Sequence, residues 1–286
     1  LLLRARLDAA KARLLSSSAG GADIAGEVGF ESLSVFHQHF RQHHGLTPAA
    51  YRELCTTRSF ELALPPGFPL GYLRRALSRD RHSLTERLVG DTYTAAVRLS
   101  TGPALLTLQL APDTVRAEVS TDTTLEAHAL VAGLLGLEQD VAAFARLAKK
   151  LGLARLVAGR PELRISQTPS VFDGLLWSII GQQINFPFAC QLRRRLVELT
   201  GRPLAGGLRA PPTPEAVAAL APADLLPLQF SRQKAGYVVA IARLVAEGKL
   251  DLAALRTMSA TRAERTLLAV RGLGPWSVNY LMMRSL

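Results

Sequence analysis

Cysteine is scarce in this sequence: Cys55 and Cys190 are the only two among 286 residues, and each lies in an apolar stretch typical of a helix. Two cysteines exclude a disulfide framework and a four-cysteine metal or iron–sulfur site within these residues. We therefore expect a protein of a reducing compartment, the cytoplasm.

Long apolar runs are also missing. No window holds about 18 consecutive apolar residues, so neither a membrane span nor a membrane partner is predicted. The opening LLLRARLDAAKARLL mixes charge with leucine at helical spacing, which predicts an amphipathic helix and not a signal peptide. Because the sequence starts without methionine, we expect the natural N-terminus to lie further upstream.

Common nucleotide and hydrolase motifs are absent as well. The sequence has no P-loop, no dinucleotide-binding fingerprint and no Ser-His-Asp arrangement, so nucleotide-dependent and triad chemistry have no support. No cofactor is expected. Hydrophobic residues make up 48% of the chain, which is enough for a folded protein with two or three cores.

The net charge of +11 is unevenly distributed. Residues 1–58 hold 7 basic and 5 acidic residues, residues 59–150 hold 10 of each, and residues 151–286 hold 17 basic and 8 acidic residues. A basic C-terminal half favours a polyanionic partner, most simply nucleic acid. An arginine-rich, high-GC proteome is the alternative explanation of this surplus.

Residues 1–58 show a helical pattern with a sharp turn at Gly29, where glycine accepts positive φ without steric cost. A second helix is predicted from about Ser32, with Phe36 and Phe40 four apart on its buried face. Small residues at Ala25 and Gly29 allow two helices to cross closely, which is typical of a helix-turn-helix. The four histidines of the second helix, His37, His39, His43 and His44, are interpreted as a solvated face, since the sequence assigns them no carboxylate or cysteine partner for a metal.

The stretch IAGEVGFESLSVFHQHFRQHHGLTPAAYR resembles the second DNA-binding repeat of AraC/Ada-type regulators. It matches the pattern I-A-x-x-x-G-F-x-S-x-S-x-F-x-x-x-F followed by G-x-T-P-x-x-Y-R. In that family the second helix enters the major groove, so the resemblance implies promoter DNA as a partner. The first repeat of such modules is missing here, and specific operator binding by this segment alone is not expected. The implied contact residues are Ser32, Ser34, Gln38, His39, Arg41 and Gln42.

Residues 59–150 alternate short strand-like runs with turns. SFELA precedes a Pro-Pro-Gly break, a helix is expected from about Pro69, and YTAAVRLS, ALLTLQLA and TVRAEVS are separated by Gly-Pro and Pro-Asp turns. This order predicts a small antiparallel sheet backed by helices, without a catalytic constellation of its own.

Residues 151–286 are helical throughout. One apolar helix ends at a polar interruption, Gly181–Asn185, and a second helix runs on to Gly201. Ser170 with Asp173 three residues later is the pattern of a capping box. In AVRGLGPWS, Gly272 and Gly274 permit a tight turn, and Pro275 suits the first turn of the next helix. Such a turn exposes backbone N–H groups as an anion site, although ordinary helix–helix turns use the same residues.

SVFDGLLWSIIGQQINFPFA, FSRQKAGYV and LLAVRGLGPWSVNYLMMR follow one another in the order and spacing of the helix-hairpin-helix DNA glycosylase superfamily. Together with the sheet segment, residues 60–286 resemble its AlkA type, DNA-3-methyladenine glycosylase II. The whole chain resembles part of an Ada–AlkA fusion, truncated at both ends. The fold class is thus α+β and mainly α, with a helix-turn-helix at 1–58, an α+β domain at 59–150 and an all-α glycosylase domain at 151–286.

The resemblance implies roles for residues of three motifs. The hairpin would hold the DNA backbone, partly through a monovalent cation on its carbonyls; the glutamine loop would enter the duplex; and two aromatic rings would line a pocket that attracts a cationic alkylated purine by stacking and cation–π forces. These residues are Gly272, Leu273 and Gly274 of the hairpin, Gln182 and Gln183 of the loop, and Trp276 and Tyr280 of the pocket.

The resemblance also bears on the reaction. Family members that cut the strand carry a lysine nucleophile at position 276, and Trp276 cannot form a Schiff base, so a monofunctional hydrolase is implied. The catalytic aspartate of the family lies roughly twenty residues beyond the hairpin, which is near position 295 and past Leu286. No acidic residue occurs between 265 and 286 to replace it, so we expect the chain to bind DNA with little excision.

Three functions stay open at this stage. The first is a bacterial, nucleoid-associated monomer that removes alkylated bases from double-stranded DNA. The second is an AraC/Ada-type transcriptional regulator with a non-catalytic DNA-binding C-terminal half. The third is a related glycosylase for oxidised or deaminated purines.

Overall fold

The computed structural model describes residues 2–122, 124–160 and 162–286. Two compact units divide the chain. The first unit ends at Arg164 and includes Val89–Tyr93 and Leu106–Arg164 beside the N-terminal 75 residues; the second contains Ala76–Leu88, Thr94–Leu105 and Ile165–Leu286. The three domains predicted from the sequence remain a prediction.

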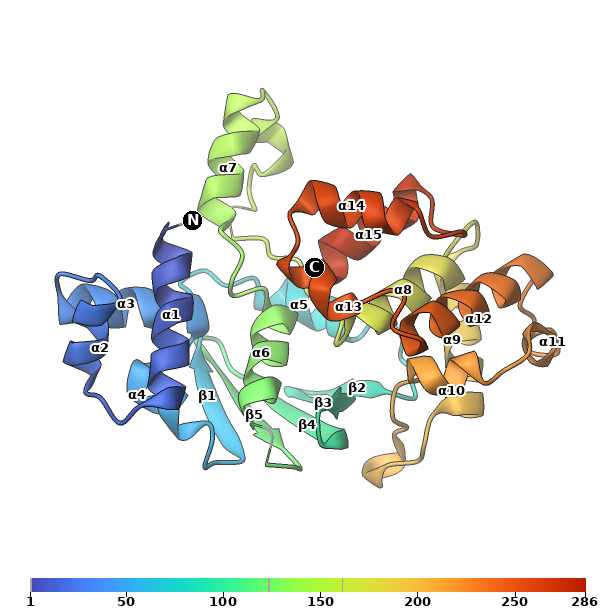
Figure 1. Cartoon of the computed structure of the whole chain (residues 1–286), viewed down its shortest axis with the longest axis horizontal. Coiled ribbons are helices and arrows are strands. Elements are labelled where there is room, and N and C mark those ends of the chain that lie inside the picture. The colour runs from blue at the N-terminus through green and yellow to red at the C-terminus, as the bar shows by residue number, and fades with distance from the viewer. Residues whose placement is uncertain (1, 123, 161) are drawn as a thin grey trace. The chain divides into compact units, whose positions relative to one another are not determined.

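The first unit begins with a group of four helices, drawn in blue in Figure 1. The first helix, α1, buries Leu7, Ala10 and Leu14 along one face, so the predicted amphipathic helix is present. Gly29 follows the second helix with φ of +88°, as the turn requires. Ser32 caps the third helix by accepting a hydrogen bond from the Val35 N–H at 3.5 Å. The helices are α1 (Leu2–Ser16), α2 (Gly21–Glu27), α3 (Leu33–His44) and α4 (Pro48–Glu53).

Helix α3 buries a stripe of rings at i, i+4 spacing. Phe36 and Phe40 are fully buried, as predicted, with their centroids 5.6 Å apart. His44 continues the same stripe, is buried, and packs edge-on against Phe40 at 4.7 Å. The interpretation of His44 as a solvated residue was therefore wrong, because its position on the helix and not its polarity decides which way it points. His37 is exposed, and His39 and His43 are half-buried.

One antiparallel sheet has the strand order β1-β5-β4-β3-β2. Three of the predicted strand runs and the strand before the Pro-Pro-Gly break are present. Strand β2 was not predicted, because its four residues, Glu86–Val89, alternate between half-buried and exposed and carry little hydrophobic signal. The other strands are β1 (Ser59–Ala63), β3 (Thr92–Leu99), β4 (Gly102–Leu110) and β5 (Thr114–Val119).

Helices complete the first unit around strands β1 and β5. Phe60 lies opposite Ala117 and Leu62 opposite Val115, so the buried residues of both strands share one face, which α6 covers (Figure 1). The predicted helix near Pro69 begins one residue later, at Leu70. The helices are α5 (Leu70–Leu77), α6 (Thr124–Leu135), α7 (Val141–Lys150) and the short 3₁₀ helix η1 (Ala154–Leu156).

The helix-turn-helix is joined to strand β1 and helix α6 of its own unit by hydrogen bonds to its backbone carbonyls. The Ala63 N–H donates to the Gly45 carbonyl at 2.9 Å, and His128 Nε2 lies 2.8 Å from the His44 carbonyl. Burial lowers the pKa of His44 to about 3 and that of His128 to about 4, so both rings are neutral at neutral pH. Gly45 has φ of +70°, and a Cβ there would lie 3.1 Å from Leu62.

The second unit is built mainly of helices, each short and most of them capped by Ser, Thr, Asn or Asp. A mainly α fold with one small antiparallel sheet is therefore confirmed. The bounds are α8 (Val171–Ile180), α9 (Phe186–Thr200), η2 (Ala205–Gly207), α10 (Pro214–Ala218), α11 (Pro222–Leu225), α12 (Arg232–Ala246), α13 (Leu252–Thr257), α14 (Ala260–Leu268) and α15 (Pro275–Ser285).

Helices α8 and α15 form the centre of this unit. Leu175 and Ile179 of α8 and Val278 and Leu281 of α15 belong to one buried apolar cluster. Gly174 allows the two helices to meet, because a Cβ at this position would lie 2.0 Å from Ser285 Oγ. Within the described ranges, no helix is long and apolar enough to cross a membrane.

Candidate nucleic-acid interface

The glycine hairpin connects α14 to α15. Gly272 has φ of +101°, and an added Cβ would lie 2.6 Å from Cγ of Tyr237, so the turn is pressed against that ring. Leu273 is buried beneath the turn. Gly274 precedes Pro275 at the start of α15, and a Cβ on Gly274 would meet no atom within 4 Å. The hairpin is thus fixed on its inner side and open at Gly274.

The start of α15 presents backbone donors next to this opening. The first hydrogen bond of the helix runs from the Val278 N–H to the Gly274 carbonyl at 3.0 Å. The amide groups of Trp276 and Ser277 precede it, and helix geometry leaves such groups without a partner inside the helix. Together with the helix dipole they form a site suited to an anion such as a phosphate.

Gln182 links the loop after α8 to the hairpin. Its Nε2 donates to the Gly272 carbonyl at 2.9 Å and to Ser277 Oγ at 3.0 Å. Ser277 Oγ in turn donates to the buried Ser178 carbonyl at 3.2 Å. Sequence reasoning grouped Gln182 with Gln183 as a residue that enters the duplex; in this structure its amide is bound within the protein.

Gln183 differs from its neighbour. Its side chain is exposed, and its backbone has φ of +54°, a left-handed conformation that residues with a Cβ rarely adopt. Only one other non-glycine residue in the described chain shares this conformation, Gln229 with φ of +67°. An outlier of this kind at a turn favours a functional position.

Replacing Gln183 separates backbone strain from side-chain function. Gln183→Gly is expected to raise the free energy of unfolding by roughly 0.5 kcal/mol, since relief of the left-handed strain exceeds the entropic cost of glycine. The same variant is expected to bind damaged duplex more weakly. Gln183→Ala is the control, because it loses the side chain and keeps the strain. Thermal unfolding and fluorescence anisotropy measure the two effects, and equal DNA binding by all three proteins would contradict a role for the side chain.

Two aromatic residues of α15 lie beside the hairpin. The rings of Trp276 and Tyr280 are stacked, with centroids 5.6 Å and planes 14° apart. Trp276 is 61% exposed, and Tyr280 is half-buried. Burial raises the pKa of the Tyr280 hydroxyl, so the ring is neutral at neutral pH. An indole this exposed contributes little to the core and is available to a ligand ring.

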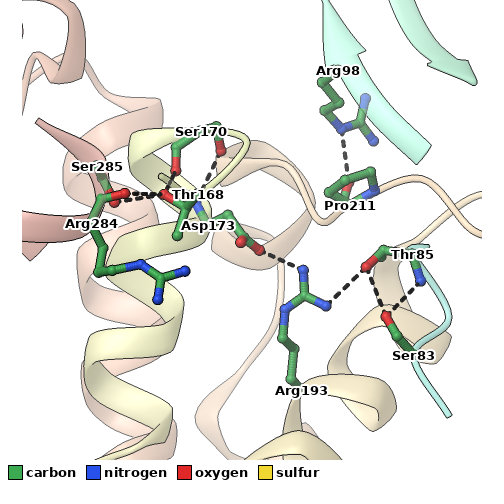
Figure 2. A network of polar contacts seen from close by, with 10 residues as sticks. All are labelled: Ser83, Thr85, Arg98, Thr168, Ser170, Asp173, Arg193, Pro211, Arg284 and Ser285. Atoms are coloured by element: carbon green, nitrogen blue, oxygen red, sulfur yellow. Dashed lines mark hydrogen bonds and ion pairs between the residues drawn. The ribbon is translucent and has the colours of Figure 1, made fainter. Parts of the chain in front are cut away.

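A buried polar network connects α8 and α9, as Figure 2 shows. Arg193 Nη2 donates to Asp173 Oδ1 at 2.7 Å, and its Nη1 donates to Thr85 Oγ1 at 3.0 Å. Asp173 was predicted to close a capping box with Ser170. Only half of that box is kept: Ser170 Oγ accepts from the Asp173 N–H at 3.0 Å, while the carboxylate of Asp173 turns to Arg193.

The arginine run of α9 is held within the protein. Arg193 bonds Asp173 and Thr85, Arg194 donates to Asp80 at 2.6 Å, and Arg195 donates to the Leu228 carbonyl at 3.0 Å. Counting charges in the sequence treats these three residues as part of a basic surface. Their partners are distant in sequence, and no local pattern reveals them.

Sequence reasoning also missed two residues of α12 that support the loop and the hairpin. Lys234 Nζ donates to the Ile180 carbonyl at 2.7 Å, where it caps the C-terminal end of α8, and burial lowers its pKa. Tyr237 supports Gly272 from below and accepts from Gln233 Nε2 at 3.0 Å. The motif FSRQKAGYV contains both, but only their contacts show what each one does.

In the first unit, α3 presents the residues expected to contact DNA. His39 is half-buried, with its ring 6.4 Å from that of Phe30; the other expected residues are exposed. Gln38, Arg41 and Gln42 border a hollow of about 530 Å³ that Ala63–Pro66 closes on the other side. The N-terminal end of α3, with Ser32 and Ser34, is therefore the more open part of the helix.

Two further expectations concern a catalytic carboxylate and a monovalent cation. The catalytic carboxylate was expected near position 295, a position outside the 286 residues of this sequence. For the monovalent cation, the Gly272 and Val270 carbonyls already accept hydrogen bonds from Gln182 and from the Leu273 N–H. Each carbonyl oxygen keeps a second lone pair, so the hairpin retains acceptors for a cation.

Comparison with known proteins agrees with this geometry. Residues 1–54 match the family model of a helix-turn-helix domain, and residues 176–275 match that of the HhH-GPD superfamily base excision DNA repair protein. The second match runs from the middle of α8 to the first residue of α15 and includes the hairpin.

Curated relatives share parts of the chain. A DNA-3-methyladenine glycosylase of Bacillus subtilis is 36% identical over 155 residues, which are 52% of this chain and 51% of the relative. The "Probable bifunctional transcriptional activator/DNA repair enzyme AlkA" of Mycobacterium tuberculosis is 27% identical over 98% of this chain and 60% of its own length. The chain thus spans about half or slightly more of these relatives.

A solved structure shows the same fold. The 3-methyladenine DNA-glycosylase from Archaeoglobus fulgidus superposes with a TM-score of 0.66 at 21% identity and covers 78% of each chain. The chain therefore has a segment that matches a helix-turn-helix domain followed by one that matches the HhH-GPD superfamily, and nearly its whole length aligns with the bifunctional relative named AlkA.

Proposed function

We propose that this chain belongs to a monofunctional DNA glycosylase that flips alkylated purines out of double-stranded DNA and hydrolyses their N-glycosidic bond. The observation that carries the proposal is the joining of loop, hairpin and aromatic pair by one side chain. Gln182 bonds both Gly272 and Ser277, so the loop that would enter the duplex and the turn that would hold its backbone are fixed to each other beside Trp276.

Within this proposal each element has one task. The hairpin at Gly274 and the start of α15 hold a backbone phosphate, and Gln183 enters the duplex. Gln182 is a positioning residue, and the stacked Trp276 and Tyr280 receive the extruded base. A cationic alkylated purine gains from stacking and cation–π attraction, worth about 0.5–2 kcal/mol, and its weakened pairing lowers the cost of flipping.

The helix-turn-helix is proposed to add promoter binding to the repair activity. The relative from Mycobacterium tuberculosis is named for both activities and aligns with nearly the whole of this chain, which supports a protein that combines them. We propose that the exposed N-terminal part of α3 enters the major groove, and that the protein acts as a monomer at the nucleoid in the cytoplasm.

Trp276→Ala tests the pocket. Loss of one stacking ring is expected to weaken binding to a duplex with an alkylated purine roughly tenfold, while binding to undamaged duplex changes less than about twofold. Because Trp276 is 61% exposed, the stability of the protein should change little. Anisotropy titrations with the two duplexes measure the ratio, and equal weakening of both would show that Trp276 only supports the fold.

An excision assay tests the activity itself. The full-length gene product is incubated with duplexes that each hold one lesion: an alkylated, an oxidised or a deaminated purine. Release of the alkylated base without strand cleavage is the expected result. Preferred release of 8-oxoguanine or hypoxanthine would move the protein to a related glycosylase class, and promoter binding without any release would leave only the regulator.

A further inference from the structure

A series of ring and guanidinium contacts leads from the interior of the second unit to its surface. The rings of Trp177 on α8 and Phe186 at the start of α9 are parallel, with centroids 5.9 Å and planes 9° apart. The Arg79 guanidinium lies over the Phe186 ring at 4.2 Å, and that of Arg193 lies over Trp177 at 5.2 Å. These four residues are called the Phe186 stack.

The segment that carries Arg79 is fixed to α9. Asp80, the next residue, accepts from Arg194 Nη1 at 2.6 Å, and Thr85 accepts from Arg193 at 3.0 Å. Asp80 is thereby neutralised by a partner other than Arg79. None of the ion pairs between described residues includes Arg79, and its side chain is exposed, so no carboxylate among these residues competes with an anion for its guanidinium.

The Phe186 stack lies near the loop that is proposed to enter DNA. Phe186 follows Gln183 by three residues, so the Cα atoms of these two residues are at most about 11 Å apart. Phosphates of one DNA strand follow each other every 3.4 Å or so along the helix axis, so this span corresponds to about three nucleotide steps. Phe186 itself is 37% exposed, and its ring contacts Arg79 at the surface.

We propose that Arg79, held flat on Phe186, binds a DNA backbone phosphate within about three nucleotides of the site that Gln183 enters. A guanidinium that stacks on a ring keeps the donors of its edge, and these match two phosphate oxygens. Stacking also orders the side chain before DNA arrives, which reduces the entropy lost on binding. The inference rests on the proposed DNA-binding function and adds a contact outside the hairpin.

A salt titration of DNA binding tests the charge. The affinity of the whole chain for a duplex with one alkylated purine is measured between about 50 and 200 mM salt. Arg79→Gln is expected to bind roughly tenfold more weakly and to reduce the slope of log affinity against log salt by about one. Lys249→Gln is the charge-matched control, since Lys249 lies beyond the far end of α12 and pairs with Glu247; its slope should equal that of the unaltered protein.

Variants of Phe186 test the stack. Phe186→Leu keeps the charge of Arg79 and removes the ring, so affinity should fall about threefold with an unchanged salt slope. Phe186→Tyr keeps the ring and should bind normally. In the double variant Phe186→Leu/Arg79→Gln the loss should equal that of Arg79→Gln alone, because the ring acts only through the arginine. Thermal unfolding of each variant verifies that the fold is kept.

Uncharged linkages in the DNA backbone identify the strand and the phosphate that Arg79 contacts. A methylphosphonate is placed in turn at each phosphate within about three steps of the lesion, on either strand. At one position, the neutral linkage should weaken DNA binding by the unaltered protein and leave DNA binding by the Arg79→Gln variant unchanged. If no position does so, or if Arg79→Gln binds with unchanged affinity and slope, the inference is wrong. Failure of the unaltered protein to bind any duplex would instead overturn the proposed function, and this inference with it.

Discussion

Gly272→Ala is expected to lower the free energy of unfolding by about 3 kcal/mol and to abolish preferential binding of damaged DNA. The new Cβ would lie 2.6–2.9 Å from three atoms of the Tyr237 ring, which is backed by the buried face of α12. Alanine is also strained at φ of +101°. The turn must shift away from Tyr237, and the hydrogen bond from Gln182 to the Gly272 carbonyl would be lost with it.

Gly274→Ala is the matched control for this turn. Gly274 has φ of −91°, and a Cβ there meets nothing within 4 Å, so the protein should be nearly as stable as the unaltered chain. The added methyl group narrows the open side of the hairpin, and DNA affinity should fall without a loss of stability. Urea unfolding followed by circular dichroism, with anisotropy on the same samples, measures both. A Gly272→Ala protein of normal stability would show that the hairpin yields more easily than its contacts indicate.

Asp173→Ala is expected to lower the free energy of unfolding by about 3–5 kcal/mol. The side chains of Asp173 and Arg193 are only 5% and 7% exposed, so removing the carboxylate leaves a buried guanidinium without its charged partner. Thr85 still accepts from Arg193, but a hydroxyl does not neutralise the charge. Asp173→Ala/Arg193→Met should recover part of the loss, since the double variant buries no charge. Denaturant unfolding of the single and double variants measures the coupling.

An exposed ion pair with nearly the same nitrogen–oxygen distance supplies the control. Arg58 Nε lies 2.6 Å from Asp122 Oδ1, close to the 2.7 Å of the buried pair, but these side chains are 64% and 78% exposed. Solvent screens exposed charges, and Asp122→Ala should leave the unfolding curve unchanged. Equal stability of the Asp173→Ala and Asp122→Ala variants would contradict this prediction. It would show that water reaches the network in Figure 2 and screens its charges.

Sequence patterns predicted the features that depend on neighbours along the chain. Spacing of four placed Phe36 and Phe40 on one buried face and brought Trp276 next to Tyr280. Glycine predicted the positive φ at Gly29 and the tight turn at Gly272, which has positive φ as well. These predictions succeeded because helix geometry and backbone sterics act over a few residues.

Features that depend on distant residues could not be predicted. Asp173 meets Arg193 across twenty residues, and Gln182 reaches Gly272 across ninety, so no local pattern pairs them. Polarity also misled: His44 is buried because it continues the stripe of Phe36 and Phe40. The exposure of Trp276 could not be predicted from local sequence either, because a tryptophan on a helix is as common in a core as on a binding surface.

The contacts at Gly45 limit how a helix-turn-helix domain can be exchanged between this protein and other regulators. The backbone of Gly45 bonds Ala63, the carbonyl before it is held by His128, and Leu62 leaves no room for a larger residue. A helix-turn-helix from another regulator could not be grafted at this junction by matching its chain ends alone. The donor domain would need a glycine with positive φ at this position and a surface that fits Leu62.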